Sequence, residues 1–184
     1  GYSYAMGTSK DLTVVCLDLS GNERWVYRFD GTQSFDDEAK DVCCDDRGNV
    51  YAAGYTSSTG TSTDLIVVSL DSLGTERWRY VFSSPGYDLA MTICYAPEGA
   101  LYVAGYVSNG GQEDLVVMKL DTTGGLVWMY TYDGPAGLQD FAISLALGEE
   151  GNLYAGGMSY GGSDVMNDIV VVSLDASGNE RWVY

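Results

Sequence analysis

Clusters of carboxylates are the residues of this sequence with the most evident chemistry. The segments DDE at 36–38 and DD at 45–46 place several acidic oxygens close together along the chain, and a hard cation such as Ca²⁺ binds several oxygens at once. No Asp-x-Asp-x-Asp-Gly loop is present to specify such a site. Three aspartates recur in one register of a repeat, at Asp37, Asp88 and Asp140. This recurrence favours a structural role, such as capping backbone N–H groups in a turn, over the alternative role of weak Ca²⁺ ligands.

The adjacent pair Cys43-Cys44 is the second local feature that could do chemistry. In the other copies of the repeat the same two positions hold CY at 94–95 and AL at 146–147. These residue types suit apolar positions of an inner strand, which is the alternative interpretation. A Cys43–Cys94 disulfide between neighbouring units would be geometrically demanding, and the cysteines do not settle the redox compartment.

The charge balance narrows the classes of partner. The sequence has 9 basic and 26 acidic residues, which gives a net charge of −17. Such a chain repels nucleic-acid phosphates and anionic lipid surfaces, so we expect no nucleic-acid partner. The sequence has no histidine, the commonest metal ligand and general base. No apolar run approaches the roughly 20 residues that a membrane helix needs, so we expect no membrane insertion.

An internal repeat must position all of these residues. One phrase occurs four times, as DLTVVCLDLSGNERWVY from Asp11, DLIVVSLDSLGTERWRY from Asp64, DLVVMKLDTTGGLVWMY from Asp114 and DIVVVSLDASGNERWVY from Asp168. The copies start 53, 50 and 54 residues apart, and each contains one of the four tryptophans of the chain, which are Trp25, Trp78, Trp128 and Trp182. A second phrase lies between them and reads GNVYAAGY at 48–55, GALYVAGY at 99–106 and GNLYAGGM at 151–158. The unit is therefore about 52 residues long.

Each unit predicts four antiparallel strands and no helix. The apolar run LTVVCL and its copies indicate a strand that is buried on both faces. It ends in D-x-x-G, which is typical of a hairpin turn, and the next strand carries Trp25 and Tyr27 on one face. The second phrase predicts an inner hairpin, with first strands at 42–45, 92–95 and 144–147. Its returning strand is rich in Ala and Gly, which indicates crowding by neighbouring backbone.

Tandem four-stranded units of this length are typical of β-propeller blades. We therefore predict an all-β fold, a partial β-propeller ring of about three and a half four-stranded antiparallel blades. Residues 1–184 would form one propeller fragment, with an incomplete blade at 1–30 and blades at 31–83, 84–133 and 134–184. A stacked solenoid is the structural alternative, but the twist of four-stranded sheets favours a ring. The tryptophans would pack between neighbouring blades and contribute a large apolar area.

The order of the two phrases resembles a known repeat. D-x-hydrophobic-x-hydrophobic-L-D-x-x-G-x-x-x-W, a Gly/Asp-rich link, D-x-A and then G-N-x-Y-x-x-G-Y are similar to the bacterial and archaeal seven-bladed β-propeller repeat family. The resemblance covers the whole chain and implies about half of a seven-bladed ring. It also implies a secreted or surface-attached protein, since such repeats are often modules of long extracellular chains.

The motif L-D-x-x-G-x-x-x-W is also similar to the tryptophan-docking motif of the quinoprotein propellers and their non-enzymatic relatives. In those proteins the Trp packs against the neighbouring blade and locks the ring. Some quinoprotein dehydrogenases carry a vicinal disulfide against their cofactor, so this resemblance implies a redox role for Cys43-Cys44. The alternative function is therefore an enzymatic propeller, most concretely a quinoprotein-like oxidoreductase. Only one unit of three holds the pair, and the main interpretation needs no cofactor.

The expected function is a non-enzymatic structural or binding module of a larger secreted or cell-surface protein, which presents variable loops to a protein or glycan partner. The loops that join the hairpins, at 56–63, 107–113 and 159–167, are rich in Ser, Gly and Asn and differ in length. Solvated connectors are the alternative interpretation of these loops. Both ends of the sequence fall inside expected strands, so we expect further blades of the same polypeptide or other chains to complete the arc.

Overall fold

The computed structural model of this chain is built from antiparallel β-strands and describes residues 1–4, 9–31, 35–57, 62–108, 111–161 and 167–184. Within these residues, fifteen strands form one three-stranded sheet and three four-stranded sheets. The all-β prediction is confirmed. The described residues also contain one short 3₁₀ turn, η1 (Glu149–Gly151), inside a hairpin where the sequence predicted no helical element.

Each sheet takes its strands from one stretch of the chain. The first sheet contains β1 (Tyr2–Tyr4), β2 (Lys10–Leu17) and β3 (Glu23–Phe29). The second contains β4 (Glu38–Cys44), β5 (Val50–Ser57), β6 (Thr63–Leu70) and β7 (Glu76–Phe82). The third contains β8 (Leu89–Ala96), β9 (Ala100–Ser108), β10 (Glu113–Asp121) and β11 (Leu126–Tyr132). The fourth contains β12 (Asp140–Leu147), β13 (Leu153–Tyr160), β14 (Asn167–Leu174) and β15 (Glu180–Val183).

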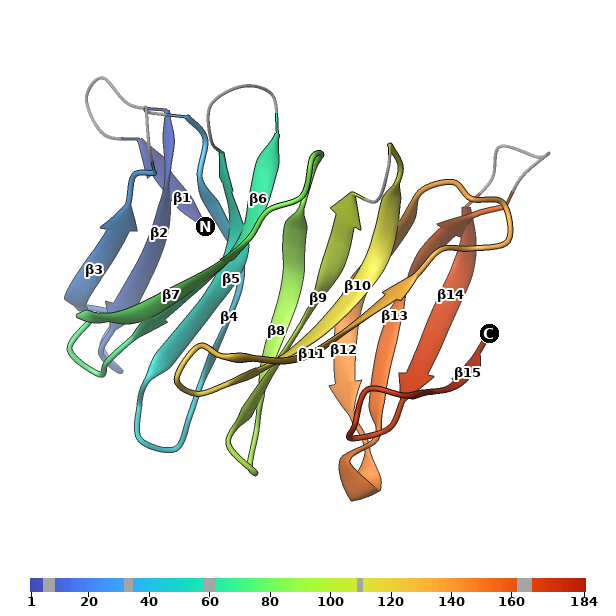
Figure 1. Cartoon of the computed structure of the whole chain (residues 1–184). Coiled ribbons are helices and arrows are strands. Elements are labelled where there is room, and N and C mark those ends of the chain that lie inside the picture. Colours follow the sequence, from blue (N-terminus) through green and yellow to red (C-terminus); the bar gives the residue numbers. More distant parts are fainter. Residues whose placement is uncertain (5–8, 32–34, 58–61, 109–110, 162–166) are drawn as a thin grey trace.

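The four sheets lie face to face in a row that follows the order of the chain, with the first and last sheets at opposite ends (Figure 1). The inner strand of a sheet lies against the preceding sheet, since β8 contacts β4, β5 and β6, and β12 contacts β8, β9 and β10. The outer strands β7 and β11 run at a steep angle to the inner strands (Figure 1). This angle is expected when the twist between neighbouring strands accumulates across a sheet.

The third strand of each internal sheet is buried on both faces, as its sequence predicted. In β6, Leu65 and Val67 belong to the apolar core shared with the third sheet, whereas Ile66 and Val68 belong to the core shared with the first. The side chains of β10 divide in the same way between the second and fourth sheets. Because successive side chains of a strand point to opposite faces, an unbroken apolar run supplies two cores at once.

The two end sheets each keep one apolar face exposed. In β2 of the first sheet Val15 and Leu17 are 51% and 56% exposed, and in β14 of the last sheet Ile169 is 76% exposed. The prediction of burial on both faces is wrong for these two strands, because no further sheet of the described residues covers their outer side. Both ends of the row therefore present exposed apolar side chains.

The inner strands β4, β8 and β12 begin several residues earlier than the sequence predicted. Each contains a β-bulge, as between Ala39 and Asp41 of β4, which lets the ladder continue through a shift of register. Opposite each bulge stands the inner glycine of the repeat, at Gly54, Gly105 and Gly157. A Cβ atom there would collide with a backbone carbonyl oxygen of the bulged strand. The crowding that the small residues predicted therefore comes from the neighbouring inner strand.

The D-x-x-G segments form the predicted turns of the outer hairpins. In the β6–β7 hairpin the carboxylate of Asp71 accepts hydrogen bonds from the backbone N–H groups of Leu73 and Thr75, both at 2.9 Å. These bonds hold the pKa of Asp71 below its usual value. Gly74 closes the turn with a φ of +83°, a conformation that strains any other residue. The equivalent glycines of the other three outer hairpins also have positive φ.

Candidate functional site

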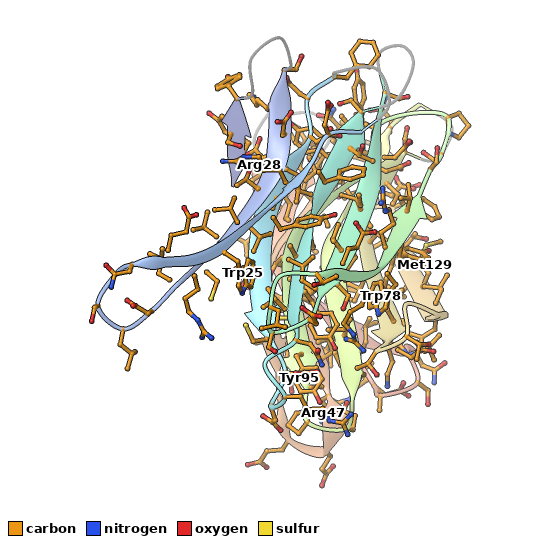
Figure 2. The ribbon with its side chains drawn as sticks, turned by 90° about the vertical axis from the view of Figure 1, so that its left-hand side faces the viewer. Trp25, Arg28, Arg47, Trp78, Tyr95 and Met129 are labelled. Carbon is orange, nitrogen blue, oxygen red and sulfur yellow. The ribbon has the colours of Figure 1, made fainter. Side chains whose placement is uncertain are left out.

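The most regular site of the molecule is a tryptophan contact at each junction between sheets. The indole Nε1–H of Trp25 in β3 donates a hydrogen bond to the backbone carbonyl oxygen of Ser72 in the second sheet, at 3.1 Å. Trp78 and Trp128 make the same bond to the next sheet, to the carbonyl oxygens of Thr122 at 2.9 Å and Ala176 at 3.3 Å. Figure 2 shows Trp25 and Trp78 on successive outer strands. Three of the four tryptophans thus contact the following sheet.

A turn glycine makes room for each of these indole rings. A Cβ atom built on Gly74 would stand 2.6 Å from Cδ2 of Trp25, and one on Gly178 would stand 2.6 Å from Cδ2 of Trp128. Gly124 has the same relation to Trp78. The glycine of D-x-x-G therefore serves two needs, a positive φ and the close approach of the ring from the preceding sheet.

A tyrosine two residues after the tryptophan adds a second contact at the first and third junctions. The hydroxyl of Tyr27 donates to Oε2 of Glu76 at 2.5 Å, and the hydroxyl of Tyr130 donates to Oε2 of Glu180 at 2.6 Å. Burial and the bond to Glu76 raise the pKa of Tyr27, so its phenol stays protonated and acts as a donor. Leu126 occupies the glutamate position at the second junction, so this polar contact is specific to the other two.

At each end of the row, one of the two partners of the tryptophan contact is present without the other among the described residues. Trp182 is 43% exposed, and its ring lies against Tyr154 of its own sheet, with 6.0 Å between the ring centroids. On the first sheet, a Cβ atom on Gly21 would meet nothing within 4 Å. The expected place of Trp182 between two sheets is therefore not found in the described residues, because no sheet follows it there.

Asp37, Asp88 and Asp140 stand where the inner strands begin, and each is at most 1% exposed. Asp37 accepts the backbone N–H groups of Gly31 at 2.7 Å and Ser57 at 3.2 Å. Burial raises the pKa of Asp37 and Asp88, and the hydrogen bonds that they accept oppose that rise. Asp140 accepts the N–H group of Gly134 at 2.7 Å. Each carboxylate thus accepts a backbone N–H group, as a turn-capping residue does, and a role in binding metal stays a prediction.

Sequence reasoning missed a second set of buried carboxylates beside these three. Asp11, Asp64 and Asp114, which open the four-fold phrase, are 3%, 7% and 3% exposed. They lie at the same junctions, where the N–H groups of Asp37 and Asp88 donate to the carbonyl oxygens of Lys10 and Thr63. Their strict recurrence in the repeat was the signal that could have marked them. The spacing of a repeat along the chain, however, does not show which residues of two different strands lie close together in space.

The cysteine pair is not joined by a disulfide. All four cysteines are free thiols, and Cys43 packs against the core between the second and third sheets. The apolar interpretation of Cys44 is wrong, since its side chain is exposed. Burial raises the pKa of Cys43 to about 12 and that of Cys94 to about 11, which keeps both thiols protonated and poorly nucleophilic at neutral pH. A redox role for the pair stays a prediction.

The variable loops lie partly outside the described residues, in the stretches 58–61, 109–110 and 162–166. The strand ends that flank these stretches are described, and the ends of β5, β9 and β13 and the starts of β6, β10 and β14 all lie on the same side of the row (Figure 1).

The fold and these junctions define an all-β protein of repeated, face-to-face sheets. No model of a known protein family matches the chain, and no curated protein matches it. Among the described residues, no helix is long and apolar enough to cross a membrane.

Proposed function

We propose that the chain is an arc of a β-propeller and acts as a non-enzymatic structural or binding module of a larger secreted or cell-surface protein. The observation that carries this proposal is the recurrence of one contact at three successive junctions. At each, an outer-strand tryptophan lies on the turn glycine of the next sheet and donates to a carbonyl oxygen two residues before that glycine. A ring of blades is the arrangement in which twisted four-stranded sheets repeat such a contact and leave no face uncovered.

The exposed ends support further blades as the partner. Trp182 carries an exposed ring, while Leu19, which matches the acceptor Ser72, is fully exposed beside Gly21. One end thus has the donor half of the recurring contact and the other end has the acceptor half. Further sheets of the same kind, from the same polypeptide or from other chains, would match both.

A groove of about 570 Å³ lies between the first and second sheets. It also supports further β-strands as the partner. It is lined mainly by apolar side chains, among them Val15, Leu17 and Val42. In the described residues β1 pairs with β2 from Lys10 to Leu12, and the N–H group of Thr13 donates to the carbonyl oxygen of Gly1 at 3.1 Å, which leaves that edge of β2 open beyond Thr13. An added strand could satisfy the backbone groups of this edge and fill the groove, as in β-strand addition.

The alternative function, a quinoprotein-like oxidoreductase, rests on the resemblance of the tryptophan motif and on the cysteine pair. Cys43 and Cys44 are free thiols, so the described geometry gives this alternative no additional support. A visible absorption band from a quinone bound to the purified protein would favour it. The structural and binding role draws its support from the repeated junctions and from the strand ends that flank the variable loops on one side of the row.

Sedimentation velocity over a range of protein concentrations tests the proposed match of the two ends. We expect the 184-residue chain to associate as its concentration rises, because the exposed halves of the contact meet between copies. Trp182→Glu should weaken this association at least about tenfold, since it would bury an unpaired charge at the contact. Met129→Glu is the matched control, because Met129 is 41% exposed and lies on the outer strand of an internal sheet.

Two results would contradict the proposal. One is a stable monomer at every concentration, which would show that the end faces need no partner. The other is equal loss of association in Trp182→Glu and Met129→Glu, which would show that any added charge acts in the same way.

A further inference from the structure

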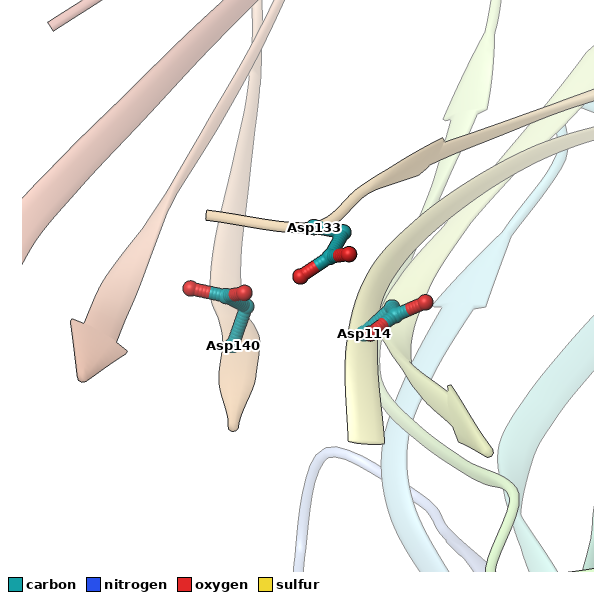
Figure 3. Close-up of side chains that lie close together, drawn as sticks. All are labelled: Asp114, Asp133 and Asp140. Carbon is teal, nitrogen blue, oxygen red and sulfur yellow. The ribbon is translucent and has the colours of Figure 1, made fainter. Parts of the chain in front are cut away.

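Three carboxylates meet where the third and fourth sheets join. Asp114 lies near the start of β10, Asp133 directly follows β11, and Asp140 begins β12. One carboxylate oxygen of each lies within 4.8 Å of the others. Figure 3 shows Asp133 between the other two, with its carboxylate turned toward that of Asp140. Asp114 and Asp140 are 3% and 1% exposed, whereas Asp133 is exposed to solvent.

Asp140 brings an unsatisfied oxygen to this cluster. Its Oδ1 atom is buried and has no hydrogen-bond partner among the described residues. Oδ1 of Asp11 and Oδ1 of Asp64 are in the same state at the other two junctions, but only Asp140 also belongs to a described group of three acidic side chains within 4.8 Å. A buried polar atom without a partner is costly, and native proteins rarely leave one unless an ion or water serves it. The carboxylate of Asp140 thus keeps one oxygen, Oδ1, that the hydrogen bond from the N–H group of Gly134 to Oδ2 does not use.

The equivalent aspartate of the preceding sheet shows why Asp140 is different. Asp88 accepts three hydrogen bonds, from the backbone N–H of Ser84 at 2.5 Å, the hydroxyl of Ser84 at 2.8 Å and the N–H of Ser108 at 2.9 Å. In the fourth sheet the residue that matches Ser108 is Tyr160, and its N–H donates instead to the carbonyl oxygen of Gln139 at 3.0 Å. In the fourth sheet the carboxylate of Asp140 therefore lacks a hydrogen bond that the carboxylate of Asp88 accepts in the third sheet.

A third aspartate is present at this junction and at the first, where Asp30 matches Asp133. The residue that matches Asp133 at the preceding junction is Ser83, so only two carboxylates, Asp64 and Asp88, meet there. Among the described residues, the set at the third junction is the one that brings three acidic groups this close. Three carboxylates at such separations repel one another. The repulsion is strongest between the two buried side chains, Asp114 and Asp140, because water does not weaken it there.

We infer that Asp114, Asp133 and Asp140 bind one Ca²⁺ ion between the third and fourth sheets. The ligand set offers only carboxylate oxygens, which suit a hard cation and not a thiolate- or imidazole-binding metal such as Zn²⁺. The exposed Asp133 gives the ion a path from solvent and leaves room for water ligands, which Ca²⁺ accepts in a flexible shell of six to eight oxygens. The ion would serve Oδ1 of Asp140, relieve the repulsion and tie two neighbouring sheets together. This site does not depend on whether the sheets form a ring or a solenoid.

Calorimetric titration of the whole chain with CaCl₂, at about 150 mM KCl to screen diffuse attraction to the acidic surface, tests the inference. We expect one site with a dissociation constant of about 10⁻⁴–10⁻³ M, the range of extracellular Ca²⁺ modules. Saturating Ca²⁺ should also raise the Tm, because an ion that binds only the folded chain stabilises it. Asp133→Ser reproduces the residue of the preceding junction at an exposed position, so it should fold, and it should weaken binding at least about tenfold.

Asp46→Ser is the matched control, because Asp46 is an exposed aspartate in a turn away from the junction and belongs to no group of three acidic side chains within 4.8 Å among the described residues. It removes the same charge and should leave the affinity for Ca²⁺ unchanged. Absence of heat and of any Tm shift up to about 10 mM Ca²⁺ would overturn the inference. Equal weakening by Asp133→Ser and Asp46→Ser would also overturn it, since binding would then follow net charge alone.

Discussion

At the scale of single residues, Trp78 connects two sheets through its ring and its indole N–H. We expect Trp78→Ala to lower the free energy of unfolding by about 2–4 kcal/mol, somewhat less than the loss at a fully buried aromatic site, because part of the ring remains in solvent. The matched variant is Trp182→Ala, in the same register but 43% exposed with no following sheet, and it should cost about 1 kcal/mol or less. Denaturant midpoints measure both, and equal losses would contradict the difference in contact.

The thiol of Cys43 gives a second prediction at this scale. Burial raises its pKa to about 12, so at pH 8 only about one molecule in ten thousand carries the reactive thiolate. Labelling by an aromatic disulfide reagent should therefore be slow at Cys43 and much faster at the exposed Cys44, and the rate at Cys43 should rise about tenfold per pH unit up to its pKa. Single-cysteine variants separate the two. Rapid labelling of Cys43, or an intact mass 2 Da low in the untreated chain, which marks a disulfide, would contradict it.

Residue types alone predicted the tryptophan contact but not all of its partners. The recurrence of Trp with D-x-x-G indicated a contact between sheets, and three junctions have it. That the glycine of the same motif faces the tryptophan of the preceding sheet could not be derived, because a repeat does not say which copies touch. For the same reason the meeting of Asp114, Asp133 and Asp140 was outside the reach of spacing.

At the scale of strands, the two adjacent glycines of β13 offer a test of the bulge. A Cβ atom on Gly157 would collide with the carbonyl oxygen of Phe141 in β12, whereas one on Gly156 would meet nothing within 4 Å. We expect Gly157→Ala to destabilise the chain by about 3 kcal/mol or more, because two backbones must separate. Gly156→Ala should be neutral or stabilising by up to about 1 kcal/mol, since it restricts the unfolded chain. Thermal or denaturant unfolding of the two variants checks this, and similar effects would show that β13 is not crowded by the bulge.

Strand type was predictable, and strand limits were not. Successive side chains of β6 and β10 point to opposite faces, and each face packs into a different core. An unbroken apolar run was therefore sufficient to predict burial on both faces. The inner strands were placed too short because residues 38–41 look polar and loop-like, although a bulge after Ala39 carries the ladder through them. The turn at Glu149–Gly151 was unexpected as a helical element, since three residues with Glu150 at a φ of +58° leave no periodic pattern.

At the scale of the whole molecule, local patterns predicted the number and order of the sheets but not whether they close on themselves. Closure depends on the small rotation between successive sheets, which is set jointly by the tryptophan contacts, the bulges and the interdigitating cores. No single residue encodes that angle. The end faces make the question testable, because a head-to-tail contact repeats its rotation with each added copy.

Electron microscopy of the associated chain therefore separates the proposed ring from the solenoid. If the recurring contact turns each sheet toward a common axis, copies joined through Trp182 and the first sheet should close after a few units into a ring with a central opening. A solenoid with the same contact would not close and would grow into filaments whose length increases with concentration. Closed particles of one size, lost in Trp182→Glu and kept in Met129→Glu, are the expected result. Filaments would contradict the propeller while leaving the end-to-end contact intact, because both shapes use the same exposed indole and the same open acceptor beside Gly21.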